Sequence, residues 1–114
     1  MPNVEGTGHE GRDRIIRAHV RVGMRMQLIR EKWNPYDANA IAVCVDTPKF
    51  LWFGGLQKIG YLDRSRAAKL APIMDGGAKL TASVLSMYTE MKFPRVTIKI
   101  SNLNIRSHRK KELV

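Results

Sequence analysis

The stretch NPYDANAIAVCV, residues 34–45, runs from a turn directly into a strand that is apolar on both faces. Alternate residues of a strand point to opposite faces of its sheet. One face of this strand is formed by Ile41, Val43 and Val45, and the other by Ala40, Ala42 and Cys44. Strands that are apolar on both faces are buried on both sides. We therefore predict a central strand here.

The turn in front of this strand raises the question of function. Asn34 and Asp37 are common in turns because their side chains hydrogen-bond the nearby backbone, and we predict a loop over residues 31–38. Asn34 and Asn39 are expected either to brace this loop or to contact a ligand. A turn has no need of an aromatic residue. Tyr36 is therefore either a rim aromatic packed over one end of the fold or a flat platform for a nucleobase.

Several further stretches show the periodicity of strands. Residues 14–22, RIIRAHVRV, alternate between apolar and basic side chains, which predicts a half-buried strand with a basic outer face. Residues 49–57, KFLWFGGLQ, are predicted to form an apolar hairpin with Gly54-Gly55 as its turn. The other predicted strands span residues 24–30, 58–62, 79–88 and 94–101.

The periodicity changes to that of a helix at Asp63, whose carboxylate is suited to cap the helix N-terminus. Ala67, Leu70, Ala71 and Met74 follow the spacing of one buried helical face. Pro72 is expected to kink this helix, because proline lacks the backbone N–H that a helix interior needs. We predict a mainly β fold: a small barrel of five or six antiparallel strands, with one kinked helix over residues 63–75 between the fourth strand and the last two.

The composition indicates one globular domain with a strong positive charge. The chain has 114 residues, of which 44% are hydrophobic, so it can build a single core. Twenty Lys and Arg against ten Asp and Glu give a net charge of +10, which favours a polyanionic partner such as DNA or RNA. No apolar run is long enough to span a membrane. The single cysteine, Cys44, is expected to be a small buried hydrophobe in a reducing compartment.

Sequence motifs for catalysis and for metal binding are absent. His9, His19 and His108 are scattered along the chain, and there is neither a Walker-type phosphate loop nor a serine nucleophile elbow. Asp63 is explained as a helix cap, and Asp37 is isolated. We therefore expect a protein that is not an enzyme, with no metal, no cofactor, no membrane partner and no small-molecule substrate.

Two blocks of the sequence resemble the HIRAN domain family. They are LIREKWNPYDANAIAV, residues 28–43, and KIGYLDRSRAAKLAPIMDGG, residues 58–77. The first block is the specific one, because five polar or turn positions coincide with the family pattern at fixed spacing. Three positions depart from that pattern: Lys32 replaces a proline, Trp33 stands where polar residues are common, and Ile15 replaces an aromatic residue. Tyr61 takes the position of a histidine in one branch of the family. The predicted domain covers residues 12–103, after a flexible lead-in (1–11) and before a charged tail (104–114).

The resemblance implies a barrel similar to the oligonucleotide-binding (OB) fold that binds single-stranded DNA, at a free 3′ end in the best-known member. It implies that Asp37 accepts a hydrogen bond from a terminal sugar hydroxyl; the alternative is that Asp37 only braces the turn. It places Tyr61 and Arg64 across the groove from Tyr36. Arg64 is expected either to clamp phosphate with the helix N-terminus or to be a solvated first-turn arginine. The predicted DNA-binding residues are Arg14, Arg30, Trp33, Asn34, Tyr36, Asp37, Tyr61 and Arg64.

Two functions of different classes are compatible with these features. The first is a non-catalytic module that recognises single-stranded DNA or DNA ends, in DNA repair or replication-fork processing. The second is an adaptor that docks to a helicase or nuclease and has only non-specific affinity for DNA or RNA. The apolar run Phe50-Leu51-Trp52-Phe53 discriminates between them, because an exposed run favours docking. In both cases we expect a cytoplasmic, nucleoid-associated protein of a bacterium or phage.

Overall fold

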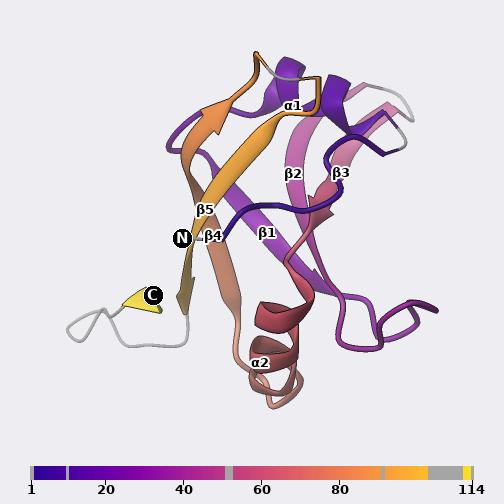
Figure 1. Ribbon diagram of the computed structural model, residues 1–114, viewed down its shortest axis with the longest axis vertical. Helices are drawn as coiled ribbons and strands as arrows, with labels where there is room; N and C mark the ends of the chain where they lie inside the picture. The colour runs from indigo at the N-terminus through magenta and orange to yellow at the C-terminus, as the bar shows by residue number, and fades with distance from the viewer. Residues whose placement is uncertain (1, 10, 51–52, 91, 103–111, 114) are drawn as a thin grey trace.

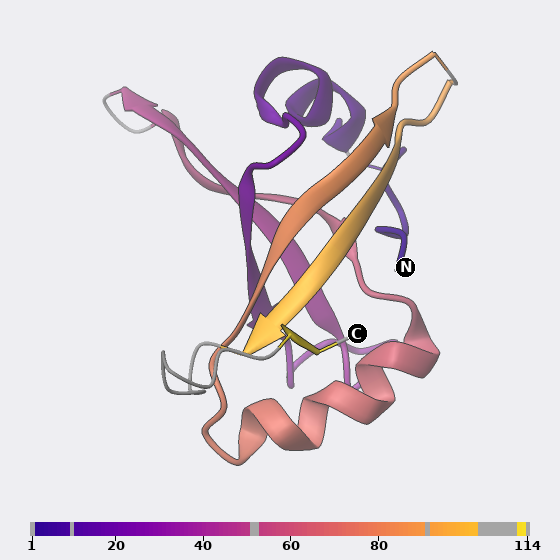
Figure 2. The same ribbon diagram turned by 90° about the vertical axis from the view of Figure 1, so that its left-hand side faces the viewer.

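The computed structural model describes residues 2–9, 11–50, 53–90, 92–102 and 112–113, and its fold is built on one antiparallel sheet with the strand order β3-β2-β1-β4-β5-β6 (Figure 1). The strands are β1 (Arg25–Arg30), β2 (Ile41–Phe50), β3 (Phe53–Tyr61), β4 (Leu80–Tyr88), β5 (Arg95–Asn102) and β6 (Glu112–Leu113). The helices α1 (Arg12–His19) and α2 (Arg64–Asp75) lie at opposite ends of the sheet (Figure 2). The predicted mainly β, OB-like architecture, with a helix before the last strands, is confirmed.

The predicted central strand is β2, which pairs with β1 on one side and β3 on the other. Its alternating residues Ile41, Val43 and Val45 are fully buried in the main hydrophobic core. Ala42 and Cys44 on the opposite face are buried as well. The strand is therefore covered on both faces, as its sequence predicts.

Helix α2 also forms where its sequence predicts. The Asp63 carboxylate accepts a hydrogen bond from the backbone N–H of Arg66 at 3.0 Å, which caps the helix N-terminus. Ala67 and Ala71 are buried, with Leu70 and Met74 partly buried against the same core. The helix continues through Pro72 and ends at Asp75.

The prediction of a strand over residues 14–22 is wrong, because this segment forms α1 and the turn after it. Arg12, Ile16 and Val20 are buried, and their spacing of four residues is that of a helix face. Ile16 and Val20 are four residues apart, so they fit the two-residue repeat of a strand face as well as the spacing of a helix face. The pattern over residues 14–22 therefore does not distinguish a strand from a helix. Packing of α1 against β3 selects the helix.

The predicted hairpin over residues 49–57 has its turn in a different place. β2 extends to Phe50 and β3 starts at Phe53, with these two residues paired, so Gly54 and Gly55 lie inside β3 rather than in the turn. Leu51 and Trp52 lie outside the described residues, as do the side chains of Phe50 and Phe53. The apolar run that would discriminate between DNA binding and adaptor docking is therefore not described.

Residues 2–5 connect two strands that are far apart in the sheet. The backbone N–H of Val4 donates to the carbonyl oxygen of Val96 in β5 at 2.8 Å. Glu5 and Tyr61 of β3 exchange backbone hydrogen bonds at 2.7 and 2.9 Å. Strand pairing within the described residues does not close the sheet. This segment nevertheless bridges β5 and β3 and gives the sheet its barrel-like shape (Figure 1).

The same segment differs from the predicted flexible lead-in over residues 1–11. Val4 is buried in the hydrophobic core. Gly60 in β3 lies so close to the segment that a Cβ there would come within 2.3 Å of the Glu5 carbonyl oxygen. Only glycine allows this approach. Residues 2–9 therefore belong to the packed structure and reach the site described next.

Candidate nucleic-acid interface

A pocket of about 550 Å³ opens beside the end of β3. It is bounded by the N-terminal segment, the loop over residues 31–40 and the first residue of α2. Its lining consists of His9, Arg12, Trp33, Asn34, Pro35, Tyr36, Asp37, Ala40, Lys58, Tyr61, Leu62 and Arg64. Six of the eight predicted DNA-binding residues thus come together in one hollow.

Asn34 shapes the loop that forms one wall of this pocket. Its side-chain oxygen accepts hydrogen bonds from the backbone N–H groups of Tyr36 at 2.9 Å and Asp37 at 3.2 Å. Its side-chain nitrogen donates to the carboxylate of Glu31 at 3.1 Å. Of the two interpretations of Asn34, the structure therefore supports the turn-bracing one.

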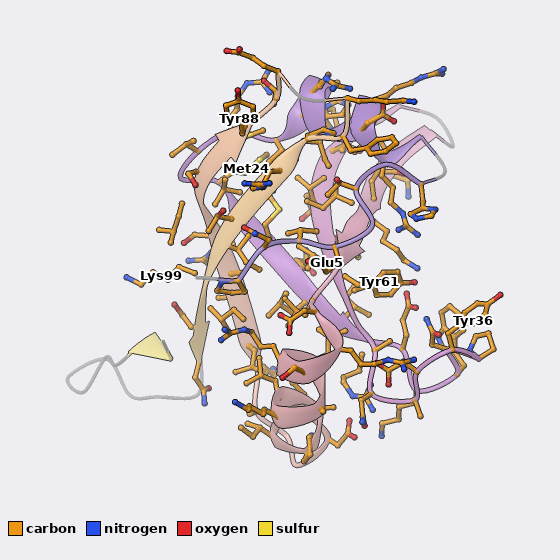
Figure 3. The ribbon with its side chains drawn as sticks, viewed as in Figure 1. Glu5, Met24, Tyr36, Tyr61, Tyr88 and Lys99 are labelled. Carbon is orange, nitrogen blue, oxygen red and sulfur yellow. The ribbon has the colours of Figure 1, made fainter. Side chains whose placement is uncertain are left out.

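Two aromatic side chains stand exposed at the mouth of the pocket. The exposed fraction is 85% for Tyr36 and 72% for Trp33. Figure 3 shows Tyr36 pointing outward at the edge of the molecule, while Tyr61 lies nearer the sheet. Tyr36 is therefore not packed over the barrel end, and its ring is available for contact with a flat ligand.

Asp37 and Arg64 face each other at the rim. Asp37 Oδ1 accepts a hydrogen bond from the backbone N–H of Asn39 at 2.9 Å. This is the turn-bracing bond that was the alternative for Asp37. In this bond Asn39 takes part through its backbone and not through its side chain. Asp37 Oδ2 lies 3.6 Å from Arg64 Nε. The Arg64 guanidinium also donates to the carbonyl oxygen of Tyr36. Arg64 remains mostly exposed and can reach a ligand in the pocket mouth.

A buried carboxylate, Glu31, lies behind the pocket wall with only 4% of its surface exposed. Lys58 Nζ is 2.6 Å from Glu31 Oε2, and the Tyr61 hydroxyl donates to Glu31 Oε1 at 2.8 Å. Burial alone would raise the pKa of Glu31, but hydrogen bonds from Lys58, Tyr61 and Asn34 outweigh it and hold the pKa below its usual value. The carboxylate is therefore ionised at neutral pH.

Lys58 was not among the predicted site residues, although it lines the pocket. Its ammonium donates to the Tyr61 hydroxyl at 2.6 Å and lies 4.7 Å from the centre of the Tyr61 ring and 5.8 Å from that of Trp33. Burial would lower the pKa of Lys58, but hydrogen bonds to Glu31 and Tyr61 raise it overall.

Arg12 and His9 were also missed, because the strand predicted over residues 14–22 and the lead-in predicted before it kept them away from the site. The Arg12 guanidinium lies 5.3 Å from the centre of the Tyr61 ring and donates to the Gly6 carbonyl oxygen at 3.0 Å. A local signal for Arg12 exists in its four-residue spacing to Ile16, which places it on the buried face of a helix.

Arg14 and Arg30 do not line the pocket. Arg14 is exposed on α1. Arg30 forms a two-pronged ion pair with Asp75, with distances of 2.9 Å from Nε and 3.1 Å from Nη2 to the two carboxylate oxygens. The hydrogen bond from Arg30 holds the pKa of Asp75 below its usual value. Arg30 thus ties β1 to the end of α2.

The remaining chemistry of the described residues is limited. They contain no group of three or more histidine, cysteine or acidic residues placed to hold a metal ion. None of the helices in the described ranges is both long and apolar enough to cross a membrane.

Known proteins resemble this chain in sequence and in fold. The family model of the HIRAN domain matches residues 3–102. A crystal structure of a protein from Lactobacillus plantarum is similar, with 28% sequence identity, a TM-score of 0.64 and coverage of 85% of this chain and 86% of the other. The crystal structure of the HIRAN domain of human HLTF is similar at 26% identity and a TM-score of 0.54, covering 85% of this chain and 70% of that one. No curated protein sequence matches.

Proposed function

This chain belongs to the HIRAN domain family, and on that premise we propose that it is a non-catalytic DNA-binding module that holds the 3′-hydroxyl end of a single strand. The main support for the proposal is that two exposed aromatic rings lie at the mouth of a pocket whose walls contain cationic side chains. Tyr36 and Trp33 flank the mouth, and Arg12, Lys58 and Arg64 line the walls. Proteins that bind single strands combine aromatic platforms for the bases with positive charge for the backbone.

A carboxylate in such a pocket favours an end over an internal stretch of backbone. Asp37 is an acceptor-only group when ionised, and its two oxygens have more lone pairs than its contacts with Asn39 and Arg64 use. A 3′-hydroxyl can donate a hydrogen bond to it. A 3′-phosphate cannot donate once ionised, and it would bring negative charge next to the carboxylate. We therefore propose that the pocket prefers a 3′-hydroxyl to a 3′-phosphate.

Competition between two oligonucleotides of the same sequence, one ending in 3′-hydroxyl and one in 3′-phosphate, tests this function by fluorescence anisotropy. We expect roughly tenfold tighter binding of the 3′-hydroxyl strand, the size of one charge-assisted hydrogen bond. Asp37→Asn should narrow the gap, because an amide can still bond but no longer repels phosphate. Asp46→Asn, an exposed acid on β2 outside the pocket lining, is the matched control. Equal affinities of the wild-type protein for both strands would disprove end recognition.

The biological setting belongs to the same proposal. A module that holds strand ends suits DNA repair or replication-fork processing in the bacterial or phage cytoplasm, where a helicase or nuclease would supply the activity on DNA. Comparison of single-stranded with blunt duplex DNA at two salt concentrations tests the non-specific alternative. Equal and steeply salt-dependent binding to both would favour a general basic surface.

A further inference from the structure

We infer that Glu31 is a specificity-determining residue of this pocket: it neutralises the Lys58 ammonium, which would otherwise attract a terminal phosphate. The inference rests on the proposed function and adds a second acid to Asp37. Glu31 does not line the pocket, so it acts through Lys58 as a positioning residue and not as a ligand contact.

The Glu31 carboxylate is held in place by several short contacts. Both carboxylate oxygens of Glu31 are engaged, Oε2 with Lys58 at 2.6 Å and Oε1 with the Tyr61 hydroxyl at 2.8 Å and the Asn34 amide at 3.1 Å. Glu31 is 4% exposed, whereas the Lys58 side chain is 29% exposed. The anion is thus buried while its cation faces the hollow.

The balance of charge in the pocket depends on this pair. Among the described residues, the lining contains the cations Arg12, Lys58 and Arg64 and the acid Asp37. Arg64 lies beside Asp37 and Lys58 beside Glu31. Arg64 and Lys58 therefore each have a carboxylate partner, and a strand end that brings an additional phosphate meets less net positive charge than the lining alone suggests. Charges a few ångströms apart in a partly enclosed site interact strongly.

Lys58 keeps one donor for a ligand even in this arrangement. An ammonium has three N–H groups, and two of them are used by Glu31 and the Tyr61 hydroxyl. The third can serve an uncharged oxygen such as a sugar hydroxyl or a base carbonyl. Without the Glu31 charge, the Lys58 ammonium loses the carboxylate partner beside it, and its positive charge favours phosphate.

The test compares the ratio of affinities for the 3′-hydroxyl and 3′-phosphate strands in three proteins. The wild type should favour 3′-hydroxyl. In Glu31→Gln, the glutamine can still accept a bond from Lys58, but the ammonium is uncompensated. We expect its ratio to fall by roughly tenfold. The log–log salt slope for the phosphate-ended strand should become steeper by about 0.7, the value for one additional neutralised phosphate.

The double variant Glu31→Gln with Lys58→Met is the control, because it removes both charges together and leaves Asp37 in place. We expect it to keep a preference for 3′-hydroxyl. Thermal unfolding of each variant establishes that it is folded. If Glu31→Gln binds both strands more weakly by the same factor, Glu31 only supports the loop and the inference is wrong. If the single and double variants lose selectivity equally, Lys58 is not the mediator and the inference is also wrong.

The outcomes separate this inference from the function on which it rests. A wild-type protein that does not distinguish the two strands overturns the proposed end recognition and the role of Glu31 with it. A wild-type protein that prefers 3′-hydroxyl, together with an unchanged ratio in Glu31→Gln, overturns the role of Glu31 alone.

Discussion

The side-chain oxygen of Asn34 accepts a hydrogen bond from the backbone N–H of Tyr36 at 2.9 Å, so the tyrosine is held in place through its backbone and not through its ring. The ring itself is 85% exposed. The two requirements of a binding loop, a fixed shape and an accessible surface, are thus met by different atoms. Changes to the ring can therefore test binding without changing the loop.

Tyr36→Ala should weaken binding to single-stranded DNA by roughly 1–3 kcal/mol, the usual contribution of one aromatic ring stacked on a base. The melting temperature should stay close to that of the wild type, because the ring contributes little to the core. Fluorescence anisotropy and thermal unfolding measure the two quantities. Tyr88→Ala is the matched control, since Tyr88 is 52% exposed at the far end of β4 (Figure 3). Unchanged affinity in a folded Tyr36→Ala protein would remove the stacking role.

Arg64→Glu should weaken binding and make it less dependent on salt. When a protein neutralises one phosphate fewer on a single strand, the log–log salt slope becomes shallower by about 0.7. Lys69→Glu changes the net charge by the same amount on the exposed side of α2, outside the pocket lining, and should leave the slope nearly unchanged. Titrations at several salt concentrations give both slopes. A slope that falls equally in the two variants would indicate general attraction to the basic surface and no specific role for Arg64.

Local sequence signals were sufficient for the parts of the fold whose residues decide their own conformation. The run from Ile41 to Val45 is apolar on both faces, and it lies in the buried central strand β2. Asp63 caps the helix that follows it. The segment over residues 14–22 was predicted wrongly because its pattern fits a strand and a helix alike, and only its packing against β3 selects between them.

The part of the candidate site that lies on a single loop was predictable from the sequence. Trp33, Asn34, Tyr36 and Asp37 lie in the same loop, and all of them line the pocket. Lys58 and Arg12 enter from other elements, and no local pattern marks a lysine that will be paired with a carboxylate 27 positions earlier. Arg30 resembles any basic surface residue in sequence, and its partner Asp75 is known only from the fold.

Cys44 should be unreactive in the native protein. Burial raises the pKa of its thiol from 9.0 to about 11, and the side chain is 5% exposed. The thiolate, which is the reactive form, is then about a hundredfold scarcer near pH 8 than for a free thiol, since each pKa unit is a factor of ten. Reaction with a thiol-specific dye should be very slow until urea unfolds the protein. Rapid labelling under native conditions would show that β2 opens locally.

The Glu31–Lys58 pair should make the folding stability depend on pH at both extremes. The pKa of Glu31 is lowered in the folded state, so its contribution is present above the usual value of 4.5 and is lost as the pH falls through the lower, folded pKa. The pKa of Lys58 is raised above 10.5, so its contribution is present below that value and is lost as the pH rises through the folded pKa.

The acid side of this dependence can be measured by urea unfolding between neutral pH and pH 3. One proton taken up on unfolding changes the unfolding free energy by at most about 1.4 kcal/mol per pH unit. Glu31→Gln should be less stable at neutral pH, because Lys58 loses its charged partner, and its stability should fall less steeply between neutral pH and pH 3. Asp75 also has a lowered pKa, because it accepts a hydrogen bond from Arg30. The variant Asp75→Asn therefore measures how much of the acid dependence comes from Asp75. If Glu31→Gln loses stability with acid as steeply as the wild type, the pKa of the Glu31 carboxylate is not lowered by folding.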